Sequence, residues 1–455
     1  MKNKNFLLCT GFMAIGYLVF SLAYYSQMYQ LYDFFEDGTV YTLSLGWAYI
    51  AQAAGMALFA YLFWRKPRIF SGRYLLTGVF ALGAAVMCAT VLMRNVHVLV
   101  TGLILTNLLC GIETGFAFSL TAAYIRKERI GMSFGVAYAI GSIGTWLISL
   151  LESELLTSPH IVPIACVLFS AAIAFVFIIK SLPTGVSSAE AEKPLKTQGL
   201  GYLVAVLILM MLVSTLGSNS YSLISKDAGI SAVAARAFYA IGLIAAGFIY
   251  DKNRRLGAIC TLASLVFPVI ATVLYGQAEL LGAVCAMSYL FLGFIAVYRA
   301  GSFMDLGVDD KRLLPIACGG LLLSRLTEAG VSFFNGTLST SPLSGLILTG
   351  ILFIPLIVLF CVMQVKQNAA AAQSPTEEMR LAAFGEKYGL TGREEEVLQL
   401  LVHGASNGEI ATSLHLSEST VRFHSANIFR KTNCGGRVEV GRLFRQSGTD
   451  QGGTI

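Results

Sequence analysis

The amino-acid sequence predicts an all-α protein: a polytopic bundle of twelve transmembrane helices in a six-plus-six arrangement, followed by a small cytoplasmic four-helix domain. Hydrophobic residues make up 56% of the 455 residues and charged residues only 13%, against about 25% charged in a soluble domain. Twenty of the 58 charged residues lie in the last 90 positions, where helix-capping pairs also recur. We therefore expect a membrane domain at 1–365, a linker at 366–385 and a soluble domain at 386–455.

Each expected span is an apolar run that can cross the ~30 Å hydrocarbon core, which takes about 20 helical residues. We expect helices because a helix satisfies its own backbone hydrogen bonds in lipid. The first run is long and lacks a small-residue cleavage site, so no cleavable signal peptide is expected. The twelve runs are 5–26, 39–64, 74–93, 96–124, 130–151, 161–181, 200–223, 231–250, 256–275, 279–303, 312–338 and 343–365.

The basic residues between these runs predict the orientation of the bundle. If the N-terminus is cytoplasmic, the cytoplasmic segments hold 17 Lys and Arg residues, and the outer loops hold only Arg94 and Lys226. Such a bias marks the cytoplasmic side of a membrane protein. An even number of spans returns the chain to that side, so we expect both termini in the cytoplasm and the bundle in a bacterial inner membrane.

The layout of the spans resembles the major facilitator superfamily. The longest polar break, 181–198, divides the runs six and six, as repeats commonly do in transporters. After the eighth run, GFIYDKNRR (247–255) is similar to a loop signature of that superfamily, with Asn253 at a departure from it. The corresponding first-half loop, 61–73, keeps basic residues but lacks the aspartate. The resemblance implies the facilitator fold.

Ionisable side chains inside the expected spans are candidates for a ligand site, because charges in lipid are costly and usually functional. Arg325 and Glu328 lie three residues apart and share a helix face. They either bind a polar ligand between the two halves or form a structural ion pair. Glu113 and Asn107 are further candidates, and tyrosines at 17, 24 and 25 either line a cavity or anchor the helix at the interface. We expect Arg236 and Arg299 to extend toward the membrane surface.

The last 65 residues contain the signals of short soluble helices. Thr391 with Glu394, and Ser406 with Glu409, have the spacing of capping boxes. Ser417 is placed to cap a third helix at about 418–432, and a fourth is expected near 437–445. Residues 419–445 carry six basic side chains and one acidic one. On a helical wheel, Arg422, Ala426 and Arg430 fall opposite Val421 and Ile428, which suits a helix that enters the DNA major groove.

This segment closely resembles the LuxR-type helix-turn-helix family over about 55 residues. Among the shared residues are Leu390, Thr391, Arg393, Glu394, Glu396, Val397, Leu398, Leu401, Gly404, Ser406, Asn407, Glu409, Ile410, Ala411, Leu414, Ser417, Thr420, Val421, Arg422, His424, Asn427, Ile428, Lys431 and Arg437. Glu395 and the run 433–436 depart from the family pattern.

The resemblance implies roles for individual residues. Base edges would be contacted by Arg422, Phe423 and Ala426. Phosphates would be bound by Thr420, Asn427, Arg430 and Lys431. A dimer contact would come from the fourth helix through Val438, Val440, Leu443 and Phe444.

Together these features predict a membrane-tethered transcriptional regulator. Its transmembrane bundle would sense a small molecule or an envelope signal, and its tail would bind double-stranded DNA as a homodimer. The alternative is a secondary transporter that carries a regulatory DNA-binding tail. No P-loop, nucleophile elbow, dinucleotide fingerprint or Cys/His cluster is present, so we expect neither enzyme activity nor a cofactor.

Overall fold

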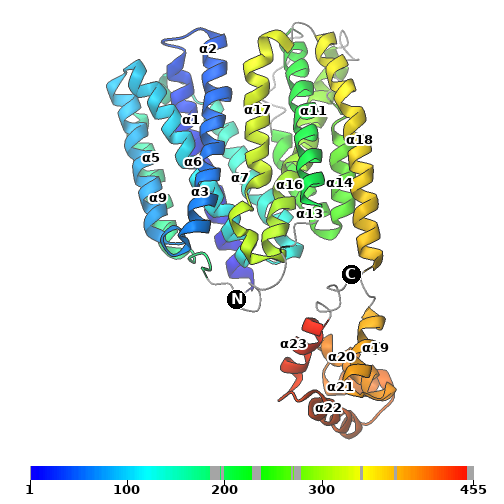
Figure 1. Ribbon diagram of the computed structural model, residues 1–455. Coiled ribbons are helices and arrows are strands. Elements are labelled where there is room, and N and C mark those ends of the chain that lie inside the picture. The colour runs from blue at the N-terminus through cyan, green and yellow to red at the C-terminus, as the bar shows by residue number, and fades with distance from the viewer. Residues whose placement is uncertain are drawn as a thin grey trace. The chain divides into compact units, whose positions relative to one another are not determined.

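The computed structural model forms two compact units, Met1–Cys361 and Val362–Ile455. It describes residues 2–184, 195, 199–227, 237–267, 270, 278–338, 342–373 and 377–447. Most of the expected break at 181–198, and Arg236, therefore lie outside the described residues. Within the described part of the chain every regular element is a helix (Figure 1).

The first half of the membrane unit contains six long helices and several short ones (Figure 1). A π-helical stretch at Thr42–Trp47 leads directly into α3, and such stretches frequently mark functional sites. The elements are α1 (Lys2–Leu31), α2 (Asp37–Tyr41), the π-helix η1 (Thr42–Trp47), α3 (Ala48–Arg65), α4 (Pro67–Phe70), α5 (Arg73–Met93), α6 (Val96–Tyr124), η2 (Lys127–Arg129), α7 (Ile130–Ser149), α8 (Ser153–Thr157) and α9 (Ile161–Ile178).

The second half follows the polar break and is also helical. Helix α18 carries Pro355 in its interior and continues beyond the end of the membrane unit. The elements are α11 (Leu200–Asp227), α13 (Ala237–Lys252), α14 (Arg254–Ser264), α16 (Ala278–Asp309), η3 (Lys311–Ile316), α17 (Gly319–Leu338) and α18 (Pro342–Gln373).

Nine helical stretches in the described residues are long and apolar enough to cross a membrane. The three remaining expected spans correspond to α13, α14 and α17. The described parts of α13 and α14 have 16 and 11 residues, and undescribed residues lie next to both. Helix α17 has 20 residues but includes Arg325 and Glu328. The chain is thus a multi-pass helical membrane protein with a helical C-terminal unit.

Glycines and one aspartate join the two halves along α7 and α13. A Cβ atom on Gly135 would lie 2.4 Å from the carbonyl oxygen of Leu243, so only glycine permits this approach of the helices. Both carboxylate oxygens of Asp251 accept hydrogen bonds of 2.7 Å, from the backbone amides of Gly131 and Met132. These amides belong to the first turn of α7, where a negative charge is favourable. The segment 247–255, at the end of α13 and the start of α14, thereby connects the two halves.

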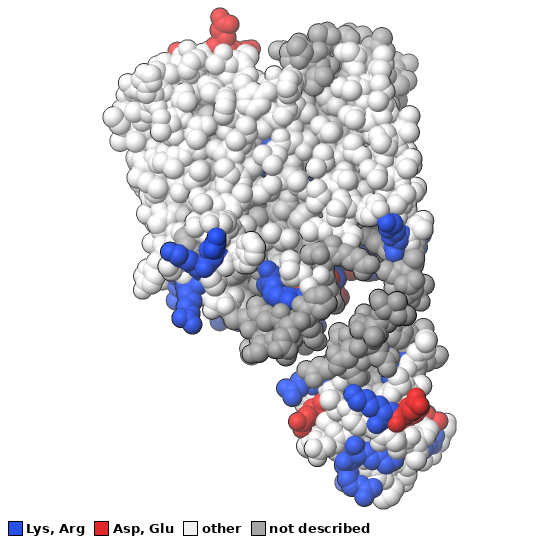
Figure 2. All heavy atoms as spheres, in the orientation of Figure 1, with Lys and Arg blue, Asp and Glu red and all other residues white. Residues whose placement is uncertain are grey.

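Basic side chains are concentrated at one end of the membrane unit. Figure 2 shows them on the visible face near the end at which α1 begins, and acidic side chains project from the opposite end. Other acidic residues pair with the basic ones, as Asp309 does with Lys127. Most of the middle of that face shows no charged side chain (Figure 2), as expected for a lipid-facing surface.

In the described residues of the C-terminal unit, five helices follow α18, one more than expected. The additional helix, α19, occupies much of the segment expected to be a linker at 366–385. Its Phe384 is buried in the core of the unit, so the hydrophobic effect holds 377–385 to the domain. The helices are α19 (Glu377–Tyr388), α20 (Gly392–Val402), α21 (Asn407–Leu414), α22 (Glu418–Thr432) and α23 (Arg437–Ser447).

Candidate DNA-binding surface and ligand cavity

Side-chain caps define where the C-terminal helices begin. Thr391 and Glu394 form a complete capping box on α20, and Ser406 and Glu409 form a second one on α21. The Ser417 hydroxyl accepts a hydrogen bond of 3.1 Å from the Thr420 amide and so starts α22. Each cap satisfies backbone donors that the first helical turn leaves free.

A tight turn sets α22 against α21. His415 adopts a left-handed conformation, with φ of 53°, and the Leu416 amide donates to the Ala411 carbonyl oxygen at 2.8 Å. This hydrogen bond closes the end of α21 as in a Schellman motif. Helix α22 therefore begins in a new direction after only three residues.

A compact core determines which face of α22 is exposed. Val421 and Ile428 have no exposed surface and pack with Val397, Leu398 and Ile410. The other buried members of the core are Phe384, Leu401, Ala411, Val440 and Phe444. Because Val421 and Ile428 face inward, the opposite side of α22 faces solvent.

The exposed side of α22 carries the residues expected to contact bases. Arg422, Phe423, Ala426 and Arg430 are exposed, and the Phe423 ring has 64% of its surface accessible. Thr420 and Asn427 are partly buried beside them. The guanidinium of Arg422 lies 3.3 Å from the Glu418 carboxylate, an exposed ion pair of the kind that contributes little.

Lys431 occupies a different environment from the two arginines. Its ammonium donates to the Glu394 carboxylate at 2.6 Å and to the Gly389 carbonyl oxygen at 2.8 Å. Burial by itself would raise the pKa of Glu394, but hydrogen bonds from Lys431 and Thr391 outweigh it and leave the pKa lowered. Lys431 thus ties α22 to the start of α20.

The four expected dimer residues of α23 divide into two groups. Val440 and Phe444 are buried in the core of their own domain, with 0% and 3% of their surface exposed. Their period on α23 points them inward, so they stabilise the domain itself in this conformation, and a partner contact through them stays a prediction. Val438 is 85% exposed and Leu443 is partly buried.

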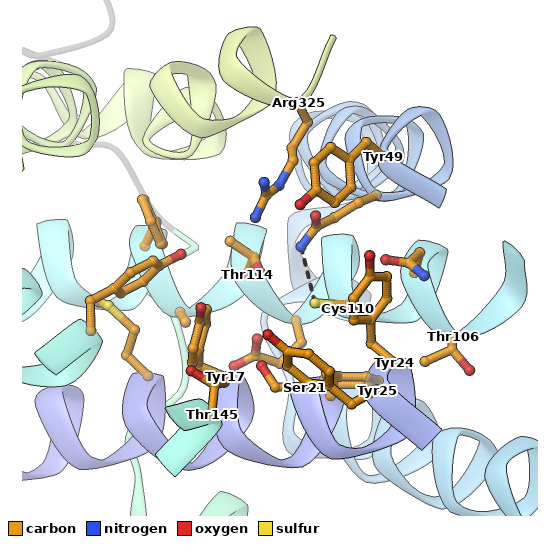
Figure 3. Close-up of a pocket in the computed structure, with 18 residues that line it drawn as sticks. Tyr17, Ser21, Tyr24, Tyr25, Tyr49, Thr106, Cys110, Thr114, Thr145 and Arg325 are labelled. Carbon is orange, nitrogen blue, oxygen red and sulfur yellow. Dashed lines mark hydrogen bonds between the residues drawn. The ribbon is translucent and has the colours of Figure 1, made fainter. Parts of the chain in front are cut away.

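A cavity of about 130 Å³ lies inside the membrane unit, between four long helices of the first half and α17 (Figure 3). The residues come from α1, α3, α6, α7 and α17, so the cavity joins the two halves of the bundle. Asn107, Glu113 and Arg325 all line it, as the sequence suggested. Figure 3 shows Arg325 extending from α17 toward the tyrosines of α1.

Glu328 lies at the wall of a second cavity and links two arginines. Its carboxylate contacts the Arg325 guanidinium at 2.7 Å and the Arg299 guanidinium at 3.3 Å. The Ser324 hydroxyl donates to the same carboxylate at 2.5 Å. The second cavity, of about 270 Å³, is lined by Arg299 and Glu328 with residues of α11, α13 and α16.

The position of Arg299 differs from the expectation based on the sequence. It was expected to extend toward the membrane surface, but its side chain is only 12% exposed and pairs with Glu328. Tyr49, Gln52 and Tyr138 also line the first cavity and were not anticipated. Tyr49 and Gln52 are three residues apart in an apolar run, a spacing that could have indicated a polar helix face.

The two units are similar to different kinds of known proteins. Residues 389–444 match the family model "Bacterial regulatory proteins, luxR family". The nitrate/nitrite response regulator protein NarP of Escherichia coli is 47% identical over 57 residues, 12% of this chain and 26% of that protein. The spore germination protein GerE of Bacillus subtilis is 44% identical over 62 residues, 14% of this chain and 84% of that protein.

The match is thus confined to the C-terminal unit, and the chain spans about a quarter of the length of the first relative, NarP. The structure of the major facilitator superfamily proton:xylose symporter XylE covers 79% of this chain and 95% of its own, with a TM-score of 0.59 and 12% identity. At that identity the likeness concerns the fold. Residues 389–444 are therefore a LuxR-type helix-turn-helix domain, and it follows a membrane domain with the major facilitator fold.

Proposed function

We propose that the chain is a membrane-tethered transcriptional regulator whose transmembrane bundle senses a small molecule or an envelope signal and controls DNA binding by the C-terminal domain. The observation that carries the proposal is the exposed basic side of α22 on a chain whose membrane domain encloses a charged cavity. A DNA-binding surface and a binding cavity thus share one polypeptide.

The DNA-binding step uses the exposed side of α22. Arg422 reads a base edge in the major groove, where arginine pairs with guanine through two hydrogen bonds. Phe423 and Ala426 add apolar contacts, and Arg430, Thr420 and Asn427 bind phosphates. Lys431 acts through its bond to Glu394, which holds α22 on α20, and so positions the other residues.

Pairing of two domains provides specificity for longer sites. One module contacts few base pairs, and two linked modules gain effective concentration on adjacent half-sites. Val438, which is 85% exposed, is the apolar side chain of α23 that is best placed for such a homodimer, with Leu443 beside it.

The sensing step uses the cavity between the halves. Arg325 belongs to the second half, whereas most of the lining belongs to the first. A ligand that binds Arg325 and the first half together favours the bundle conformation in which they are close. The ion pairs of Glu328 extend that effect from α17 to α16.

The bundle lies in the bacterial inner membrane with both termini in the cytoplasm. This orientation is supported by the bias of 17 basic residues against two in the loops and by the basic end of the bundle at which α1 begins (Figure 2). It leaves the C-terminal domain in the compartment that contains the chromosome.

The experiment is genome-wide chromatin immunoprecipitation of the tagged full chain, compared with Arg422→Ala. Loss of one base-reading arginine costs about 1–3 kcal/mol, so affinity for the specific sites, and with it their occupancy, should fall about fivefold or more. Arg442→Ala removes an exposed arginine from α23 and is the matched control. Equal occupancy for Arg422→Ala and the unaltered chain would contradict the proposal.

A working secondary transporter with a regulatory tail is the second candidate, because the fold is that of a symporter. It predicts ligand flux into vesicles that contain the purified chain, and flux that persists after deletion of 386–455. A sensor predicts ligand binding without flux.

A further inference from the structure

The charges around the first cavity are unequal on its second-half side. Arg299 and Arg325 share the single carboxylate of Glu328, and the Nε atom of each arginine is buried without a hydrogen-bond partner in the described part of the chain. Two guanidinium groups against one carboxylate leave one positive charge uncompensated. A buried charge without a partner is costly, so an anionic group at Arg325 would be stabilised.

The first-half side of the same cavity has the opposite imbalance. Glu113 on α6 is 3% exposed, forms no salt bridge to any described residue, and its Oε1 atom has no hydrogen-bond partner. The carboxyl group packs against Gly16 of α1, where an added Cβ atom would lie 2.1 Å from Oε1. Among the described residues, Glu113 Oε1 therefore lacks a cation or a hydrogen-bond donor.

The side-chain amides near the cavity satisfy neither Arg325 nor Glu113. The Asn107 side-chain amide donates to the carbonyl oxygen of Leu103 at 2.9 Å, and the Gln52 amide donates to Cys110 Sγ at 3.1 Å (Figure 3). Both are thus bound to their own surroundings. Aromatic rings form much of the remaining wall, together with hydroxyl side chains such as Ser21 and Thr114, and the faces of tyrosine rings attract cations. The aromatic lining residues are Tyr17, Phe20, Tyr24, Tyr25, Tyr49, Phe118 and Tyr138.

We propose that this cavity binds a small zwitterion, an amine that carries a carboxylate. Its carboxylate pairs with Arg325, whose guanidinium is held over the Tyr49 ring at 4.2 Å from the centroid. Its ammonium group is received by Glu113 among the tyrosines of α1. The ligand satisfies two unpartnered groups at once, which neither a simple acid nor a simple amine does. The inference rests on the proposed sensing role and specifies the chemical class of the signal.

The test measures binding to the full chain in lipid nanodiscs by calorimetry with matched compounds of three lengths. The zwitterions are glycine, β-alanine and 4-aminobutanoate. Acetate, propanoate and butanoate lack the amine, and methylamine, ethylamine and propylamine lack the carboxylate. Hydrogen bonds to charged groups imply that one zwitterion binds at least about tenfold more tightly than both of its partial analogues. If no zwitterion shows this preference, the proposal is overturned.

Two variants locate the preference within the cavity. In Glu113→Gln, the affinity for the preferred zwitterion should fall to that of its carboxylate analogue, while the affinity for the analogue stays unchanged. Glu154→Gln alters an exposed carboxylate outside the cavity and should leave the preference intact. An unchanged preference in Glu113→Gln refutes the assignment of the ammonium site. If Glu113→Gln does not fold, the selectivity of the unaltered chain decides.

Failure of this inference can be told apart from failure of the proposed function. The difference in DNA occupancy between Arg422→Ala and the unaltered chain reports on the C-terminal domain, and its measurement needs no added zwitterion. Absence of zwitterion binding together with that loss would leave the regulator in place and remove only the chemical class of its signal.

Discussion

The DNA-binding surface and the membrane cavity place their arginines in opposite environments. Arg422 is exposed on one helix, and the residues beside it come from the same dozen positions of α22. Arg325 is largely buried, and the residues around it come from five helices that span positions 13 to 325. A surface on one helix is encoded locally, whereas a cavity among several helices depends on how the whole bundle packs.

Glu394 of the C-terminal domain and the charged groups of the bundle differ in how their polar atoms are satisfied. In the C-terminal domain, Glu394 receives Lys431 and the amide of Thr391. In the bundle, the side chains of Glu113, Arg299 and Arg325 each retain a buried polar atom without a partner among the described residues. Complete satisfaction indicates a structural role, and incomplete satisfaction indicates a place for a ligand.

The largest expected effect concerns α23. Phe444→Ala empties a core position that packs edge-on against Phe384 at 5.3 Å, and it should lower the unfolding free energy of a 377–455 fragment by about 3–5 kcal/mol. Val438→Ala, on the exposed side of the same helix, should change it by less than about 0.5 kcal/mol. Denaturant titration measures both. Equal losses would place Val438 in the core as well.

A smaller loss is expected when the tie between α20 and α22 is broken. Glu394→Ala removes a helix cap and the partner of the partly buried Lys431, which together should cost about 2 kcal/mol in the same fragment. Glu396→Ala removes an exposed ion pair with Arg393 and should cost about 0.5 kcal/mol or less. Similar values for the two variants would argue against a structural role for Lys431.

The corresponding change in the bundle should be smaller still. Glu328→Gln leaves Arg299 and Arg325 without their shared carboxylate, and polar pairs inside membranes contribute about 1 kcal/mol. Thermal unfolding of the full chain in detergent should therefore show a modest decrease of the midpoint. Glu154→Gln provides the comparison, and an unchanged midpoint in Glu328→Gln would show that this carboxylate does not hold the helices together.

Acidification should weaken the C-terminal domain. The pKa of Glu394 lies below its usual value of 4.5 in the folded state, because hydrogen bonds outweigh burial, and hydrogen bonds from Ser406 lower the pKa of Glu409 likewise. A lowered folded-state pKa gives stability that is present above pH 4.5 and is lost as the pH falls through the lower value. The unfolding free energy of the fragment should decrease from pH 7 to pH 3, and less steeply in Glu394→Gln. Equal slopes would contradict this assignment.

The sequence by itself determined the elements whose causes are local. The apolar runs follow from the thickness of the bilayer, and the starts of α20, α21 and α22 follow from capping side chains within three residues of each backbone donor. The inward side of α22 follows from the helical period of Val421 and Ile428. Arg325, Glu113 and Asn107 could also be chosen from the sequence as cavity candidates, because polar groups in apolar runs are costly.

Only the tertiary structure decided which of these side chains meet. Lys431 pairs with a carboxylate 37 positions away, and Arg299 pairs with Glu328 on another helix, so neither partner could be inferred from spacing along one helix. Burial of Val440 and Phe444 depends on α19, whose Phe384 completes the core from a segment that looked like a linker. These outcomes required the chain to fold, because contacts between distant segments depend on packing and not on local propensity.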